Sequence, residues 1–173
     1  MLETSRLHIS LMAAEDCEEV RILHNDPDTL KWLSDTHIVS GDEQQSWFAA
    51  LQSSKTSKRY IARTKSYSKL IGVFRFDRYD KVNMSVEVGL DIESTSRRQG
   101  YAREIYRALI PHFFDDLSLN RLSLLTLESN LAAINLYESL GFKREGILRQ
   151  ALRRDSRYLN ACQYSLLASE FEK

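Results

Sequence analysis

The spacing of hydrophobic residues changes several times along the chain, and each change marks a predicted element. Apolar and polar residues alternate over residues 6–11, as in a strand with one buried face. Apolar residues then recur at steps of three and four over residues 15–24 and 43–51, which predicts two helices. Residues 25–28, Asn-Asp-Pro-Asp, form a predicted turn between them.

The middle of the chain predicts three strands followed by a helix. Strand-like runs cover residues 60–63, 70–76 and 84–92. After Gly100, the helical spacing is carried by Ala102, Ile105, Leu109 and Phe113. Pro111 falls inside this pattern, so we expect the helix to bend or end there.

The last third predicts a strand, a helix and a hairpin. Residues 121–127 form a β-rich run, and Asn130 is a suitable N-cap for the helix that follows. Gly141 ends that helix, and residues 146–153 and 158–167 pair as an antiparallel hairpin. These elements predict an α/β (α+β) fold with a mixed, mostly antiparallel sheet flanked by helices.

Composition is that of an ordinary soluble domain, and at 173 residues the chain is expected to form one domain. Basic and acidic residues number 24 each, which argues against a nucleic-acid-binding protein. We recognise no signal peptide and no apolar run of membrane-spanning length, so we expect a cytoplasmic protein without a membrane partner.

A metal site is not expected. Cys17 and Cys162 are far apart and lack metal-ligand spacing. The four histidines are also scattered, without the i, i+4 pairing of a helical zinc site. Both cysteines are expected to be reduced packing residues.

The most informative segment is Arg97-Arg98-Gln99-Gly100-Tyr101-Ala102, which lies between a predicted strand and a predicted helix. The free amides and positive dipole at a helix N-terminus favour an anion such as phosphate. Glycine lets the backbone approach such a ligand closely, and Arg97, Arg98 and Arg103 add positive charge. By itself, the segment could equally be an ordinary surface turn.

Taken with its neighbours, the segment resembles the phosphate loop of the GNAT superfamily of acyl-CoA-dependent N-acetyltransferases. The loop pattern Gln/Arg-x-x-Gly-x-Gly/Ala is matched by Arg97, Gly100 and Ala102. A later helix matches from Asn130 through Ala133 to Leu136-Tyr137-Glu138-Ser139-Leu140-Gly141-Phe142. The C-terminal segments, including residues 157–160 and 164–167, are similar to the branch of ribosomal-protein N-terminal acetyltransferases.

The resemblance implies a single domain that binds acetyl-CoA as cosubstrate and needs no metal. Residues 1–80 would lie mainly on the acceptor side, residues 84–142 would form the acetyl-CoA-binding core, and residues 143–173 the C-terminal hairpin. The sheet would splay beside the cofactor, with Gly89 as a plausible bulge. The implied cofactor-binding residues are Leu90, Asp91, Ile92, Arg97, Arg98, Gln99, Gly100, Tyr101, Ala102, Arg103 and Asn130.

The implied chemistry is direct attack of an amine on the thioester in a ternary complex. A backbone N–H near residues 88–90 would hold the oxyanion. Glu87 is our candidate general base, with Glu128 as the alternative, and Tyr137 would protonate the departing CoA thiolate. Glu87 could instead be a surface ion-pair residue, and Tyr137 could be a core residue.

The acceptor is less defined by the sequence. Residues 93–96 lack the proline often found before this loop, and Ser156 and Asn160 replace the glycine and aspartate of many relatives. Residues 24–32 and 45–48 look similar to enzymes that acetylate nucleotide-linked amino sugars, with Trp32 or Trp47 available for stacking; both tryptophans could equally belong to the core. A small-molecule amine, a peptide N-terminus and a non-catalytic acetyl-CoA-binding module all stay open, and a homodimer is plausible.

Overall fold

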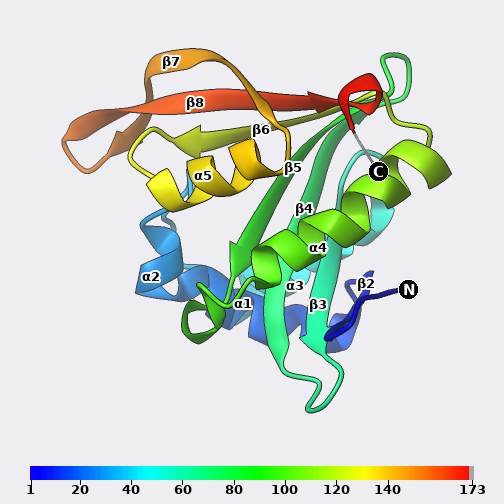
Figure 1. The fold of residues 1–173 in the computed structure, drawn as a ribbon. Coiled ribbons are helices and arrows are strands. Elements are labelled where there is room, and N and C mark those ends of the chain that lie inside the picture. Colours follow the sequence, from blue (N-terminus) through cyan, green and yellow to red (C-terminus); the bar gives the residue numbers. More distant parts are fainter. Residues whose placement is uncertain (172–173) are drawn as a thin grey trace.

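A computed structural model describes residues 1–171, which are built around one twisted eight-stranded sheet (Figure 1). The strands are β1 Leu2–Glu3, β2 Leu7–Leu11, β3 Lys58–Thr64, β4 Leu70–Asp80, β5 Ser85–Ile92, β6 Arg121–Leu127, β7 Lys143–Arg154 and β8 Arg157–Leu167. Their order is β1-β2-β3-β4-β5-β6-β8-β7. Only β5 and β6 pair in parallel, so the mixed, mostly antiparallel sheet is confirmed.

Helices cover both faces of the sheet. They are α1 Cys17–Asn25, α2 Pro27–Leu30, α3 Gly41–Ser53, α4 Tyr101–Pro111 and α5 Leu131–Ser139. Short 3-10 turns cover Ala14–Asp16, Ser94–Ser96 and Ala168–Glu170. In Figure 1, α4 crosses in front of the central strands, while α1 and α3 lie behind them. No helix within residues 1–171 is long and apolar enough to cross a membrane.

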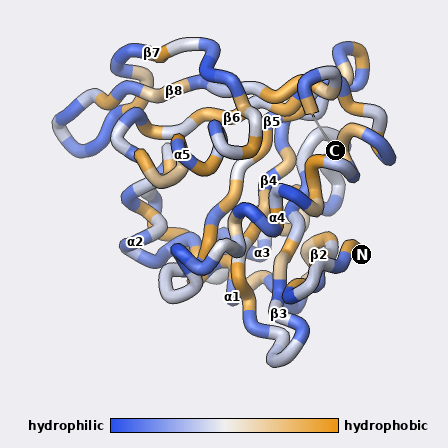
Figure 2. Tube along the Cα trace, in the orientation of Figure 1, coloured by the Kyte–Doolittle hydropathy of each residue, from blue (hydrophilic) through white to orange (hydrophobic). Residues whose placement is uncertain are grey.

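Alternation along β3 and β4 divides the interior between these two faces. Tyr60 and Phe74 belong to a large core with α4, whereas Ile61 and Val73 belong to a smaller one with α1 and α3. Figure 2 shows hydrophobic positions concentrated in the central strands and a mostly hydrophilic tip where β7 turns into β8. Residues next to each other in sequence therefore face different layers, as a strand period of two requires.

Two local features differ from the predicted pattern. Residues 25–28 do turn the chain, but Pro27 also begins the short helix α2, and the Asp26 side chain accepts a hydrogen bond from the amide of Asp28. The two-residue strand β1 was too short to give a periodic signal. The expected effect of Pro111 is confirmed: α4 ends there, and a π-helical turn follows over His112–Asp116.

The feature that positions the site is the separation of β5 from β6. These strands pair only from Ser85 opposite Arg121 to Glu87 opposite Ser123. Beyond Glu87, β5 continues to Ile92 with β4 as its partner. The backbone of residues 88–92 therefore has an edge free of β6, which is the predicted splay.

The predicted bulge at Gly89 is wrong. Gly89 pairs with Arg75 in a register that runs unbroken from Gly72 opposite Ile92 to Asp77 opposite Glu87. The glycine serves another purpose, because a Cβ placed there would lie 2.5 Å from Nη2 of Arg75. The missing side chain makes room for a guanidinium rather than for an extra residue.

Candidate active site

The predicted phosphate loop contains two residues with left-handed backbone. Gly100 has a φ of +83° and Arg98 a φ of +60°, both in the left-handed region. The first helical hydrogen bond of α4 runs from the Glu104 amide to the Gly100 carbonyl. The amides of Tyr101, Ala102 and Arg103 precede it, so they have no acceptor within the helix and suit an anion.

Arg97 has a different role from the one expected of its charge. Its guanidinium donates to the carbonyl oxygens of Ile92 and Asp28 and to the Thr29 hydroxyl, at 2.9–3.0 Å. It therefore fastens α2 to the end of β5. The backbone amide of Arg97 donates to the Ser94 carbonyl at 3.4 Å.

Arg6, which we did not predict from the sequence, stabilises the loop from outside. Its Nη1 donates to the Gln99 carbonyl at 3.1 Å, and its Nη2 pairs with Glu104 at 2.6 Å. The guanidinium also stacks on the Tyr101 ring at 4.1 Å from its centroid. Only tertiary contact between the N-terminus and α4 reveals this function.

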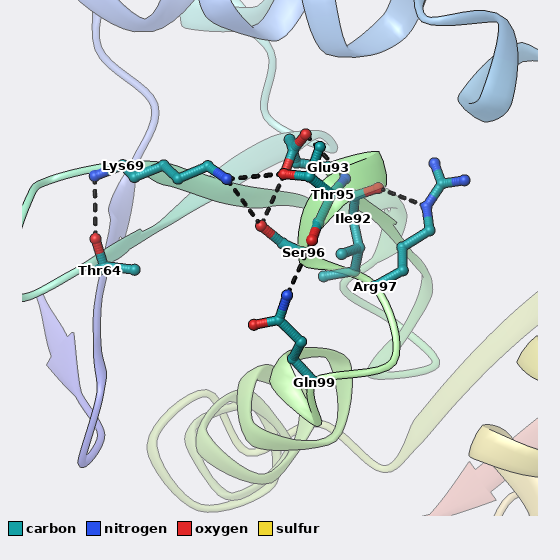
Figure 3. Close-up of polar contacts among 8 residues, drawn as sticks. All are labelled: Thr64, Lys69, Ile92, Glu93, Thr95, Ser96, Arg97 and Gln99. Atoms are coloured by element: carbon teal, nitrogen blue, oxygen red, sulfur yellow. Dashed lines mark hydrogen bonds and ion pairs between the residues drawn. The ribbon is translucent and has the colours of Figure 1, made fainter.

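A polar cluster around Glu93 holds the segment just before the loop (Figure 3). The Glu93 carboxylate accepts hydrogen bonds from Thr95 and from the Ser96 hydroxyl and pairs with Lys69 at 3.2 Å. Partial burial opposes ionisation, but these contacts prevail and lower the pKa of Glu93 to about 2. The cluster thus holds residues 93–96, a segment without proline, through side-chain contacts.

The predicted pantetheine edge presents two kinds of side chain. Leu90 and Ile92 pack against the large core. Asp91 points to the opposite face, where its Oδ2 lies 3.7 Å from Nε of Arg75. The side chain of Asp91 thus lies on the face of α1 and α3, while its backbone belongs to the splayed edge.

Tyr137 is buried, and its ring contacts Tyr106, Phe142 and Tyr164. Burial raises the pKa of Tyr137, while the nearby cation Arg75 opposes that rise. A phenol that stays protonated at neutral pH can act as a proton donor. Its helix begins as predicted, with Asn130 accepting a hydrogen bond from the Ala133 amide at 3.2 Å.

The two candidate bases are both partly exposed and ion-paired. Glu87 pairs with Arg78 at 2.8 Å, which is the alternative arrangement foreseen for it. Glu128 accepts a hydrogen bond from Asn160 at 2.9 Å and lies 3.9 Å from Arg144. Neither carboxylate lines the pocket described below.

A pocket of about 330 Å³ lies between α1, α3 and the sheet. Its lining residues are Val20, Leu23, His24, Leu33, Ser34, Asp35, His37, Val39, Glu43, Gln44, Trp47, Arg59, Val73, Arg75 and Asp91. All except Asp91 come from residues 1–80. The volume is that of a small-molecule site.

The two tryptophans occupy different positions. Trp47 lines the pocket, packs against the smaller core and lies 5.5 Å from the guanidinium carbon of Arg59. Trp32 is 39% exposed, lies near Lys31 and does not line the pocket. Of the two tryptophans, only Trp47 lines this pocket.

Residues 1–171 contain no cluster of three or more His, Cys, Asp or Glu side chains that could hold a metal ion. Cys17 and Cys162 are both free and buried. The burial of both thiols matches the packing role expected of them.

Comparison with known proteins identifies the family. The acetyltransferase (GNAT) domain family matches residues 6–143. The chain belongs to the GNAT acetyltransferases. It is therefore an acetyl-CoA-dependent N-acetyltransferase, with acetyl-CoA as the cosubstrate.

Relatives of this GNAT protein align with it either over most of its length or over part of it. A Bacillus licheniformis protein named N-acetyltransferase p20, described as uncharacterized, is 27% identical over 173 residues, 98% of this chain and 97% of its own. YdaF of Bacillus subtilis, provisionally named a ribosomal N-acetyltransferase, is 30% identical over 103 residues, 60% of this chain and 56% of its own. The crystal structure of Vibrio cholerae spermidine N-acetyltransferase with CoA and spermine superposes with a TM-score of 0.90 at 21% identity, covering 96% of this chain and 98% of that one.

Sequence motifs missed two polar residues of the pocket, Arg75 and Gln44. Arg75 lies in a strand-like run, and Gln44 is in the first turn of α3. Neither residue belongs to a sequence motif. Their place in the pocket wall depends on side chains from other elements, which the local sequence does not specify. The one available signal was a charged residue inside the apolar run 70–76.

Proposed function

We propose that this GNAT enzyme transfers the acetyl group to the primary amine of a small molecule held in the pocket between α1, α3 and the sheet. The observation that carries the proposal is the position of Asp91. Its side chain lines the pocket, and its backbone belongs to the free edge of β5. An acceptor in this pocket would therefore reach the edge where the thioester is expected to lie.

In the proposed mechanism, both substrates are bound before reaction. The amine nitrogen attacks the thioester carbonyl, and a backbone N–H of residues 88–90 holds the developing oxyanion. Glu87 receives the amine proton through water. The carbon–sulfur bond then breaks, and Tyr137 protonates the CoA thiolate.

The cofactor-binding part of the proposal assigns the pyrophosphate to the amides of residues 98–103, with Asn130 contacting the cofactor arm. Leu90, Asp91 and Ile92 would pair with the pantetheine through their backbone. The free amides of the first turn of α4 support the first assignment, and the absence of β6 pairing beyond Glu87 supports the second.

A nucleotide-linked amino sugar remains our specific acceptor candidate. Its support is Trp47 on the pocket wall, whose indole can stack on a sugar or base. Polyamines are the second candidate, because the Vibrio cholerae neighbour is a spermidine N-acetyltransferase crystallised with spermine. A peptide N-terminus is the third, favoured by the C-terminal similarity to ribosomal-protein acetyltransferases and by the name of YdaF.

The test is release of CoA thiol from acetyl-CoA in the presence of amino-sugar nucleotides, polyamines, amino acids and peptides with free N-termini. Saturable release with small amines, and none with peptides, is expected. Release with peptides alone would overturn the small-molecule assignment. Thermal stabilisation by acetyl-CoA without release in any arm would favour a binding module.

A further inference from the structure

Two hydrogen-bond donors in the acceptor pocket have no partner within residues 1–171. Gln44 is only 5% exposed, and its Nε2 makes no hydrogen bond. Nε of Arg75 is also buried without a hydrogen bond, and its contact with Asp91 is a 3.7 Å ion pair. Both residues line the pocket.

The pocket's other charged side chains already have protein partners. Arg59 donates to Asp77 at 2.8 Å. The Glu43 carboxylate accepts from the Ser40 amide and contacts His37 at 3.0 Å. His37 also donates its amide to Asp35.

One ring nitrogen of each histidine in the pocket already has a protein partner. Nε2 of His24 contacts the His37 carbonyl at 3.1 Å, and the His37 ring contacts Glu43. Among the pocket-lining residues of the described chain, the buried side-chain donors without a partner are Nε of Arg75 and Nε2 of Gln44. Asp91, beside Arg75, is the carboxylate with the longest ion pair in the pocket.

Unpartnered donors of this kind call for an oxygen-bearing ligand. A buried donor without an acceptor is unfavourable because it has lost its hydrogen bonds to water, and an arginine fork matches the two oxygens of a carboxylate or phosphate. Gly89 supports this arrangement, because the Arg75 guanidinium occupies the space beside it. The cation is thereby held next to the free edge of β5.

We propose that Arg75 and Gln44 bind an anionic group of the acceptor, a carboxylate or a phosphate. The preferred acceptor is then an amine that also carries an anion, and not a polyamine. This inference rests on the proposed function, since it assigns the acceptor class of the same pocket. It also fits a nucleotide-linked amino sugar, which carries phosphate.

The first experiment uses pairs of amines that differ only by an anionic group. Lysine differs from cadaverine by a carboxylate, and glucosamine 6-phosphate differs from glucosamine by a phosphate. Spermidine serves as the polycation. We expect kcat/KM to favour the anionic member of at least one pair by about tenfold or more, and the pair concerned distinguishes carboxylate from phosphate.

Substitutions then assign the preference to residues. Arg75→Gln should lower the preference about tenfold or more, chiefly through KM of the anionic acceptor, while the neutral-tail partner changes little. Arg75→Lys should restore part of it, because lysine keeps the charge without the fork. Gln44→Leu should lower it less. Arg153→Gln, on the exposed tip of the β7–β8 hairpin, is the matched control and should change nothing.

Two outcomes would overturn the inference while leaving the small-molecule function intact. One is a preference for spermidine or cadaverine over every anionic amine. The other is an unchanged preference in Arg75→Gln with unchanged stabilisation by acetyl-CoA.

If no amine is acetylated, the anion subsite is tested by calorimetry. The measurement is the binding of lysine and of glucosamine 6-phosphate in the presence of CoA. Binding to the wild type that is lost in Arg75→Gln would support the anion subsite and place the failure on the proposed reaction. No binding of either compound to the wild type would overturn the subsite.

Discussion

The guanidinium of Arg75 lies over the backbone of Gly89, in the space that a side chain at position 89 would fill. The two residues are paired across β4 and β5, and a Cβ on Gly89 would lie 2.5, 2.8 and 2.9 Å from three guanidinium atoms. The same guanidinium borders Asp91 and the acceptor pocket. The glycine therefore places a cation where β5 leaves β6.

Gly89→Ala should displace Arg75 and reduce acetylation with little loss of stability. The atoms in the way belong to the end of a flexible side chain, so the sheet itself need not move. We expect kcat/KM to fall about tenfold and the melting temperature to change by only a few degrees. Gly146→Ala is the control, because its Cβ would meet nothing within 4 Å; equal activity in the two variants would contradict the prediction.

Gly100→Ala should weaken acetyl-CoA binding. The φ of +83° is strained for alanine, with a cost of about 1 kcal/mol or more, and relief of that strain would distort the phosphate loop. The measurement is the rise in melting temperature produced by acetyl-CoA, compared with wild type. Gly146→Ala again serves as control, and an unchanged acetyl-CoA response in Gly100→Ala would remove the loop from the cofactor site.

Tyr137→Phe should lower kcat while leaving acetyl-CoA binding in place. The variant keeps the ring contacts with Tyr106 and Phe142 but removes the proton that the thiolate would receive. Thiolates leave readily, so we expect a loss of about 10- to 100-fold, at the low end for acid catalysis. Wild-type turnover in this variant would restrict Tyr137 to a packing role.

Glu87→Gln should lower kcat about 100-fold at neutral pH, with Glu128→Gln having little effect. Glutamine preserves the size of the side chain but cannot accept the amine proton. The decisive measurement is the pH profile of kcat for each variant. Loss in Glu128→Gln alone would move the base to the alternative carboxylate, and loss in neither would remove both.

Glu93→Gln should destabilise the protein most at neutral pH. The folded-state pKa of Glu93 is about 2, against 4.5 ordinarily, so the unfolded state binds more protons between these values. The stabilisation by Glu93 is thus complete above pH 4.5 and declines as pH falls toward 2.

We expect the Glu93→Gln variant to lose about 1–3 kcal/mol of unfolding free energy at pH 7, with the difference from wild type narrowing between pH 5 and pH 2. Urea unfolding at several pH values measures it. Glu15→Gln, an exposed glutamate, is the control. A difference from wild type that does not change with pH would contradict the role of the charge.

Local patterns in the sequence determined most of the elements and the framework of the predicted cofactor site. Strand-like runs predicted the central strands, and Gly100 marked the predicted phosphate loop because glycine lets the backbone approach a ligand closely. Asn130 and Gly141 marked the two ends of α5 for equally local reasons. Each of these predictions depends on residues within a few positions of one another.

The tertiary structure alone decided what surrounds each polar side chain. Arg97 resembled a phosphate ligand, yet its guanidinium binds α2. Gly89 resembled a bulge, yet it accommodates Arg75. Hydrogen bonds and steric fit depend on side chains that are distant in sequence and adjacent in the sheet, so local periodicity carries no information about them.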